Sequence, residues 1–183
     1  MELINESLPG LLELKMVVHE DNRGSFCEAF NQRTMAGFGI EETFVQDNES
    51  RSVSAGTVRG LHLQVDPHAQ GKLVRVLRGA IFDVALDLRP DSPTYLQHSS
   101  IELAEDDFRV FWIPAGFAHG FCTLEPNTTI AYRVTGFYNR DAERSILWND
   151  PDLGIDWPIS VDDAVLSTKD AAAPSFAEYR AEN

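Results

Sequence analysis

Glycine and proline interrupt this sequence roughly every 10 to 20 positions, and that spacing limits the folds that the chain can form. The runs between them are short and rich in Val, Ile, Phe and Leu, as β-strands are. The clearest strands are predicted at Thr57–Gln64, Leu73–Leu77, Ala80–Leu88, Phe108–Ile113 and Thr129–Thr135. Many short strands separated by turns predict an all-β fold.

The predicted strand Ala80–Leu88 shows the alternation most clearly. Its even-numbered residues from 82 to 88 are apolar, whereas Asp83 and Asp87 have the other parity. This is the period-2 pattern of a half-buried strand. The preceding Arg78-Gly79 predicts a tight hairpin turn, because glycine readily adopts the positive φ that such a turn needs.

Helix signals are weak and confined to Gln32–Ala36 and Pro174–Arg180. No internal repeat or low-complexity tract is present. We therefore predict a single domain, residues 1–183, folded as a closed β-sandwich or barrel with short peripheral helices, of which a cupin-type jelly-roll barrel is one form. Small barrels of this kind bind ligands in their mouths, so inward-facing polar side chains mark the candidate site.

The chain is strongly acidic, with 15 Lys and Arg against 29 Asp and Glu and a net charge of -14. It lacks the excess of cations that nucleic-acid binding requires. No apolar run approaches the roughly 18 residues of a membrane span, and the N-terminal residues do not resemble a signal peptide. We expect a cytoplasmic protein without a nucleic-acid or membrane partner. Residues 51–89, with six cations and three acids, are a candidate region for binding a small anion.

Two histidines stand in motifs that could carry chemistry. The first is His62 in Arg-Gly-Leu-His-Leu-Gln, where strand alternation would put Gly60, His62 and Gln64 on one face. A glycine there permits close approach of another backbone, and a histidine can act as a base near neutral pH. The second is His119, which follows a Pro-Ala-Gly turn just past a predicted strand. The remaining histidines are expected at the surface: His19, His68 and His98.

A metal ion is a second possible use of such a pocket. Metal-dependent cupins bring two histidines and a carboxylate from the first motif to the histidine of the second, since a divalent ion needs at least three good ligands. Here Gln64 replaces one histidine, and Lys72 follows near the carboxylate's position. An ammonium would compete with the ion, so we predict no metal and no other cofactor. Cys27 and Cys122 are expected to be reduced thiols.

His62, Lys72, His119 and Tyr132 together suit proton removal next to a carbonyl group. A histidine can take the proton, a lysine can stabilise the oxyanion that develops, and a tyrosine can return a proton. Each residue alone is equally typical of a packed or hydrogen-bonded core position. Their joint occurrence favours an active site.

The chain resembles the dTDP-4-dehydrorhamnose 3,5-epimerases, metal-independent sugar-nucleotide epimerases of the cupin superfold, from Asp21 to about Asp170. The similarity rests on eight segments in the family's order: Asp21–Glu28, Phe44–Asn48, Arg59–His62, Gly71–Arg75, Asp91–Thr94, Ile113–Phe121, Ile146–Pro151 and Leu166–Asp170.

The resemblance implies a role for each candidate catalytic residue. His62 would remove protons from C3 and C5 of a 4-keto sugar, and Asp170 would pair with His62 and hold its tautomer. Lys72 would stabilise the enolate oxygen at C4, helped by His119 and Arg59. Tyr132 would return a proton on the opposite face.

The resemblance also implies that the substrate is a dTDP-linked 4-keto-6-deoxy sugar. The residues implied to bind it are Arg23, Phe26, Glu28, Gln46, Asp47, Asn48, Arg59, His119, Tyr138, Glu143 and Lys169. Tyr138 would stack on the thymine, and an arginine suits the diphosphate because its planar fork binds two oxygens at once. Family members exchange their N-terminal segments, so the resemblance implies a homodimer in which Arg23 and Glu28 reach the partner's site.

Two positions depart from the family pattern. Phe137 stands where many relatives have a tyrosine, and Leu63 stands where an aromatic residue is common. Both differences would change nucleotide affinity and substrate choice. Neither alters the proposed base, the proposed acid or the lysine that would stabilise the enolate.

Three other functions are compatible with parts of the pattern. A mono-epimerase acting at C3 or C5 alone would share these motifs. A metal-dependent cupin dioxygenase or isomerase would need ligands in place of Gln64 and Lys72. A non-catalytic sugar-nucleotide binder would not need base, cation and acid together.

Overall fold

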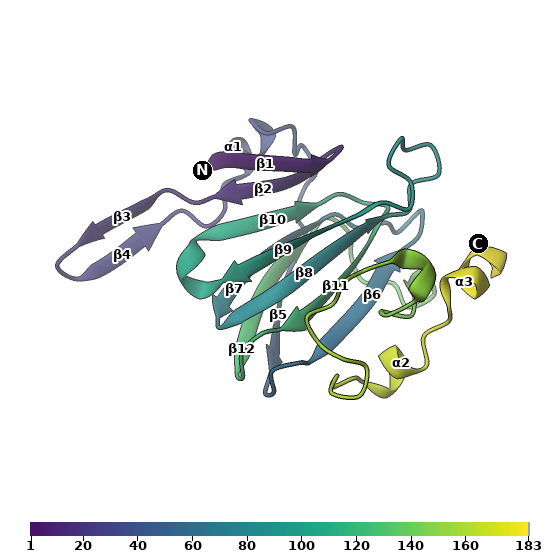
Figure 1. Cartoon of the computed structure of the whole chain (residues 1–183). Coiled ribbons are helices and arrows are strands. Elements are labelled where there is room, and N and C mark those ends of the chain that lie inside the picture. The colour runs from purple at the N-terminus through teal and green to yellow at the C-terminus, as the bar shows by residue number, and fades with distance from the viewer. Residues whose placement is uncertain (183) are drawn as a thin grey trace.

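Two antiparallel sheets form the body of the protein (Figure 1). The computed structural model describes residues 1–182. The larger sheet has the strand order β1 (Glu2–Leu8), β2 (Leu11–Lys15), β10 (Arg109–Ile113), β7 (Lys72–Arg78), β12 (Thr128–Val134) and β5 (Gln46–Ser52). The smaller sheet has the order β13 (Glu143–Ser145), β6 (Val58–Gln64), β11 (Phe117–Thr123), β8 (Ala80–Asp87) and β9 (His98–Ala104). The predicted all-β jelly-roll barrel is thereby confirmed.

The remaining elements are short and lie outside the two sheets (Figure 1). They are the hairpin β3 (Val18–Asp21) and β4 (Gly24–Cys27), the helices α1 (Gln32–Ala36), α2 (Thr168–Ala171) and α3 (Phe176–Glu182), and the 3-10 turns η1 (Glu105–Asp107) and η2 (Pro151–Leu153). None of the helices within residues 1–182 is long and apolar enough to cross a bilayer.

The five predicted strands correspond to β6, β7, β8, β10 and β12, with ends that differ by at most one residue. Gly79 has a φ of 75° and forms the predicted turn between β7 and β8. Both predicted helices are present, and α3 begins two residues later than predicted. His119 was expected just past a strand, but it lies within β11, because the chain turns at Gly116 and immediately re-enters the smaller sheet.

The prediction of a half-buried strand at Ala80–Leu88 is wrong, because both faces of β8 are covered. Asp83 and Asp87 are 0% exposed and belong to the interior. The opposite face, with Val84 and Leu86, packs beneath the segment that runs from Ile146 into α3. The buried carboxylates are tolerated because each one is paired: Asp83 accepts from His119, and Asp87 accepts from Arg89.

The apolar core fills only part of the space between the sheets. It includes Val74, Ile81 and Phe111 from strands of both sheets. Phe121 and Ile130 belong to this core and also line a polar cavity. The cavity therefore begins where the apolar packing ends, as expected for a small barrel that binds a ligand in its mouth.

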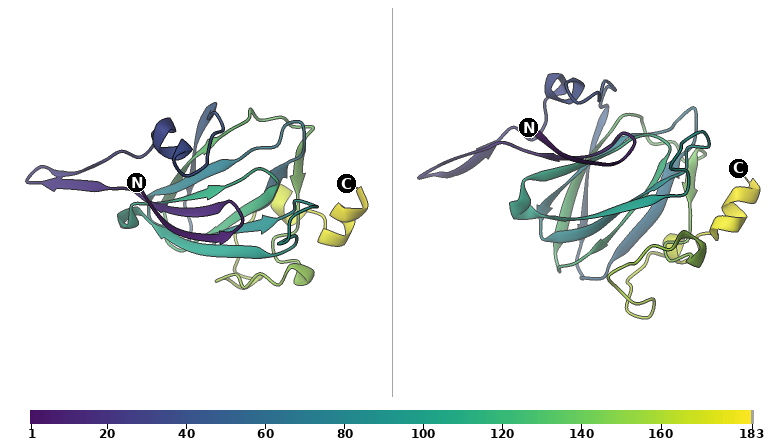
Figure 2. Two further views of the ribbon diagram at one scale, coloured as in Figure 1. Left: turned by 90° about the horizontal axis from the view of Figure 1, so that it is seen from above. Right: turned by 45° about the horizontal axis from the view of Figure 1, so that its top comes forward.

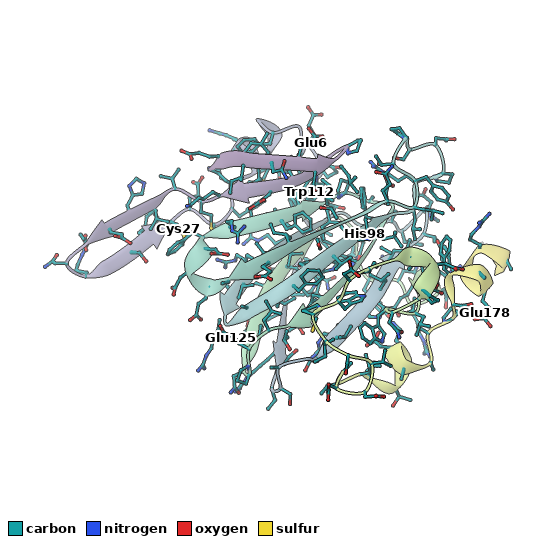
Figure 3. The ribbon with its side chains drawn as sticks, viewed as in Figure 1. Glu6, Cys27, His98, Trp112, Glu125 and Glu178 are labelled. Carbon is teal, nitrogen blue, oxygen red and sulfur yellow. The ribbon has the colours of Figure 1, made fainter. Side chains whose placement is uncertain are left out.

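The β3–β4 hairpin projects away from the barrel in every view (Figures 1 and 2). Phe26 on this hairpin is 70% exposed. Cys27 lies where the hairpin rejoins the body (Figure 3) and packs against the apolar cluster of Met16 and Phe30. Because its strands pair only with each other among residues 1–182, the hairpin offers its side chains to the surroundings.

The remaining cysteine and histidine predictions are mostly confirmed. Cys27 and Cys122 are free thiols, and burial raises the pKa of Cys122 to about 11, so that this thiol is inert at neutral pH. His19 and His68 are exposed. His98 is half-buried rather than fully at the surface, because its Nε2 contacts the carbonyl oxygen of Gly154 at 3.3 Å.

Candidate active site

A polar cavity in two adjoining parts opens between the sheets. One part has a volume of about 300 Å³ and the other about 370 Å³. His62, Lys72 and Tyr132 line both parts. The first part also contains Ser50, Arg59, His119, Phe121, Ile130, Ser167, Lys169 and Asp170, and the second contains Gln46, Asn48, Leu63, Gln64, Gln70, Val134, Tyr138 and Glu143.

The predicted pair of His62 and Asp170 is present. His62 Nε2 lies 2.6 Å from Asp170 Oδ1, and Ser167 Oγ donates to Asp170 Oδ2 at 2.7 Å. Burial raises the pKa of Asp170, but these hydrogen bonds outweigh it and bring the pKa below its ordinary value. An ionised Asp170 accepts the Nε2 proton of His62, which leaves Nδ1 unprotonated and able to act as a base. Sequence reasoning did not identify Ser167, although a serine three residues before Asp170 is an N-cap signal.

His119 forms a second histidine–carboxylate pair, with Asp83. Its Nε2 lies 2.7 Å from Asp83 Oδ1. Burial lowers the pKa of His119, partly opposed by the Asp83 carboxylate. Because His119 is directly opposite His62 in the pairing of β11 with β6, the two imidazoles enter the same cavity. Sequence reasoning missed Asp83, whose parity on β8 was interpreted as facing solvent.

Lys72 and Tyr132 come from the larger sheet, across the cavity from His62. Lys72 Nζ donates to the carbonyl oxygen of His62 at 3.2 Å. Burial lowers the pKa of Lys72 to about 8, although Asp83 and Glu143 oppose the shift. Burial also raises the pKa of Tyr132. At neutral pH the site therefore holds a cationic ammonium and a protonated phenol.

His62 and Gln64 of β6 line the same part of the cavity as predicted, but the alternation breaks between Arg59 and His62. Three residues of β11, from His119 to Phe121, face four residues of β6, from His62 to Arg59, so β6 carries an extra residue there. As a result Arg59 and His62, three positions apart, both line the cavity. Gly60 permits this close pairing as expected, since a Cβ on it would lie 2.6 Å from the His119 carbonyl oxygen.

Glu143 connects several residues at the cavity mouth. Lys169 Nζ lies 2.6 Å from Glu143 Oε1, and the Tyr138 hydroxyl donates to Glu143 Oε2 at 3.1 Å. Gln46 and Asn48 are on the inward face of β5, where the Gln46 amide donates to Asn48 Oδ1 at 2.7 Å. These five residues, all implied by the sequence to bind substrate, lie around one opening.

No group of three or more His, Cys, Asp or Glu side chains within residues 1–182 is arranged to hold a metal ion. Gln64, at the position where metal-dependent cupins carry a histidine, is hydrogen-bonded to backbone groups of His68, Phe137 and Asn139.

A family model described as dTDP-4-dehydrorhamnose 3,5-epimerase matches residues 5–178. This chain belongs to that family. A dTDP-4-dehydrorhamnose 3,5-epimerase of Sinorhizobium fredii is 49% identical over 158 residues, which cover 86% of this chain and 80% of the relative.

Solved structures of the epimerase family have the same fold. The Legionella pneumophila enzyme in complex with dTDP-4-keto-L-rhamnose is 43% identical, with a TM-score of 0.92 over 99% of this chain and 95% of that one. A 3'-monoepimerase from Streptomyces bikiniensis in complex with dTDP-quinovose is 30% identical, with a TM-score of 0.89 over 100% of this chain and 90% of that one.

Four of the residues that the epimerase resemblance implies for substrate binding lie outside the cavity of their own chain. Asp47 is on the outward face of β5 and pairs with Arg133 at 3.2 Å. Arg23, Phe26 and Glu28 are on or next to the projecting hairpin. Arg23 pairs only with Asp21 of the same hairpin among residues 1–182, at 2.6 Å.

Proposed function

We propose that the protein inverts C3 and C5 of dTDP-4-dehydro-6-deoxy-D-glucose and so produces dTDP-4-dehydro-L-rhamnose. The observation that carries this proposal is the placement of base and acid: His62 and Tyr132 belong to opposite sheets and line the same cavity, together with Lys72. The bound sugars in the related solved structures support a dTDP-linked substrate.

At each centre, His62 Nδ1 takes the proton from the carbon next to the C4 ketone. The electron pair of the broken C–H bond forms a C=C bond, and the carbonyl electrons move onto the C4 oxygen. The Lys72 ammonium stabilises that enolate oxygen. The enolate then collapses and takes the Tyr132 phenolic proton on the opposite face, which inverts the carbon. His62 then releases the proton it took to solvent, and Tyr132 regains a proton from solvent, before the second centre reacts.

The reaction needs no redox cofactor, because the ketone already acidifies the hydrogens at C3 and C5. Asp170 keeps Nε2 of His62 protonated, so that Nδ1 remains the basic nitrogen. Asp83 orients the ring of the buried His119 through Nε2, which leaves Nδ1 of the neutral imidazole as a hydrogen-bond acceptor in the cavity wall.

The protein is further proposed to act as a homodimer with exchanged N-terminal segments. Arg23 and Phe26 belong to the hairpin that projects away from its own barrel, and the exposed Glu28 follows it, which suits contact with a second copy. In that arrangement Arg23 reaches the substrate diphosphate of the partner's site.

Proton NMR in heavy water tests the reaction. The protein is incubated with dTDP-4-dehydro-6-deoxy-D-glucose, and a protein-free sample corrects for spontaneous exchange. We expect deuterium at both C3 and C5 together with signals of the inverted product. Deuterium at one carbon only would favour mono-epimerisation, which the similarity to the 3'-monoepimerase makes the second candidate. Deuterium at neither carbon would overturn the proposal.

A further inference from the structure

Gln64 is a buried amide that the reaction does not use. It is the last residue of β6, two positions after His62, and it is 5% exposed. Its Nε2 donates to the carbonyl oxygens of His68 at 2.7 Å and Phe137 at 3.2 Å. Its Oε1 accepts from the backbone N–H of Asn139 at 2.7 Å. The side chain therefore uses both donors and its acceptor on backbone groups.

Two of these backbone groups belong to the neighbours of Tyr138 on either side. Tyr138 itself is 57% exposed, and its hydroxyl bonds to Glu143. An aromatic side chain this exposed has little packing to fix its position, so its backbone must be held by other means. Gln64, which lines the second part of the cavity, provides that anchor because it binds the backbone of both Phe137 and Asn139.

The rest of the loop between β12 and β13 is held from the same side. Gln70 Nε2 donates to the carbonyl oxygen of Gly136 at 2.5 Å. The Asn139 side chain accepts from the backbone N–H groups of Asp141 at 2.9 Å and Ala142 at 3.2 Å. Gln64 is the residue in this network whose bonds span Tyr138.

Only an amide of this length can make the three bonds. A glutamate would keep an acceptor and lose both donors, and a leucine would fill the same space with no polar group. Without this donor, the carbonyl oxygens of Phe137 and His68 would lose their hydrogen bonds and the loop would become less ordered. None of the groups that take part in the reaction would be removed.

We propose that Gln64 is a positioning residue that holds Tyr138 in place at the cavity mouth to stack on the base of the nucleotide. It acts through Tyr138 and touches neither the base nor the reacting carbons. Fixing the loop before the ligand arrives reduces the entropy lost on binding, so Gln64 governs nucleotide affinity and not proton transfer. The assignment of a nucleotide to Tyr138 rests on the proposed function.

A double-mutant cycle with dTDP, measured by isothermal titration calorimetry, tests the link. Gln64→Leu and Tyr138→Ala should each weaken dTDP binding roughly tenfold, and the double variant should bind no more weakly than Tyr138→Ala alone. In kinetics, Gln64→Leu should raise KM by the same factor and leave kcat within about twofold. Additive losses of about a hundredfold, or unchanged binding in Gln64→Leu, would overturn the proposal.

Gln32→Leu is the matched control. It removes one amide bond to a backbone carbonyl, that of Glu42, at an exposed site on α1, and should leave dTDP binding unchanged. If Gln64→Leu does not fold, Gln64→Asn keeps an amide that is one methylene too short and should show the same coupling. A wild-type protein that binds dTDP but exchanges neither carbon would overturn the proposed reaction, while the coupling of Gln64 to Tyr138 would still be decided by dTDP affinity.

Discussion

The barrel cavity and the β3–β4 hairpin carry two parts of the candidate site, and their side chains are held in different ways. In the cavity, the His62 side chain is 28% exposed and its partner Asp170 only 5%. On the hairpin, the Arg23 side chain is 84% exposed and pairs with Asp21, whose side chain is 49% exposed. An exposed ion pair contributes little to holding a side chain, whereas a buried one is fixed by the surrounding packing. The cavity side chains are thus held by their own chain, whereas Arg23 of the hairpin is held only by an exposed ion pair among residues 1–182.

The largest effect should follow from removing the base in the cavity. His62→Asn keeps a small polar side chain but has no basic nitrogen. We expect deuterium exchange at C3 and C5 to fall by about a thousandfold or more, with dTDP affinity nearly unchanged. Single-turnover NMR in heavy water measures the exchange.

The matched control for the base is His98→Asn, on the far strand β9, which should exchange at the wild-type rate. Exchange persisting in His62→Asn within tenfold of wild type would assign the base to another cavity residue.

Replacing Lys72, the cation that stabilises the enolate, should have the next largest effect. Lys72→Met should slow exchange roughly a hundredfold, because the enolate loses its counter-charge. The same change should raise the midpoint of thermal unfolding at pH 7, since burial of the ammonium destabilises the fold by roughly 1–3 kcal/mol. Slower exchange with an unchanged or lowered midpoint would show that burial of the Lys72 ammonium does not destabilise the fold.

The pH dependence of the cavity should be set by Lys72 on its alkaline side. The folded pKa of about 8 lies below the ordinary value of 10.5, so the charged form is lost as the pH rises through about 8. We expect kcat/KM of the wild type to fall about tenfold per pH unit above that point. Lys72→Arg, which stays charged, should move this decline above pH 9 or so at a lower rate. An unmoved decline in Lys72→Arg would assign it to a different group.

The lowered pKa of Lys72 also makes the stability of the fold depend on pH. Between about pH 8 and the unfolded value of 10.5, the unfolded chain binds more protons at Lys72 than the folded one. The contribution of Lys72 to the free energy of unfolding therefore increases as the pH rises across this interval.

The smallest effect is expected on the hairpin. Arg23→Ala should raise KM roughly tenfold and leave kcat unchanged, because it removes a contact to the diphosphate and none to the reacting carbons. Mixed dimers of Arg23→Ala with His62→Asn distinguish the two regions. If the hairpin reaches its partner, one site in the mixed dimer holds both natural residues and recovers the wild-type KM. A mixed dimer that retains the raised KM would place Arg23 at its own chain's site.

Local patterns were sufficient to predict much of the barrel. β6, β7 and β12 are short apolar runs bounded by turn residues, and they carry His62, Lys72 and Tyr132. The strand β11 was missed because its run from Phe117 to Thr123 contains histidine and glycine, which weaken the alternation. The first six of the seven residues of β1 are exposed and show no apolar face, so nothing in their pattern indicated a strand.

The parts of the site that escaped prediction depend on contacts between distant segments. Asp83 is 36 residues from His119 in the sequence. The alternating pattern of β8 shows that Asp83 lies on the face opposite Val84 and Leu86, but it does not show whether that face meets solvent or the barrel interior. The bulge that brings Arg59 to the side of His62 is set by register with β11, which a single strand's pattern does not contain. Whether the hairpin contacts the cavity of its own chain or of a second copy likewise depends on how chains assemble, which local sequence patterns do not determine.

Tyr132→Phe is the most direct test of the central claim, that base and acid act from opposite walls of one cavity. The variant keeps His62 and Lys72 and loses only the phenolic proton. NMR in heavy water should show continued deuterium incorporation with retained configuration at the centre that Tyr132 serves. Loss of exchange and inversion together at that centre would contradict separate roles for His62 and Tyr132.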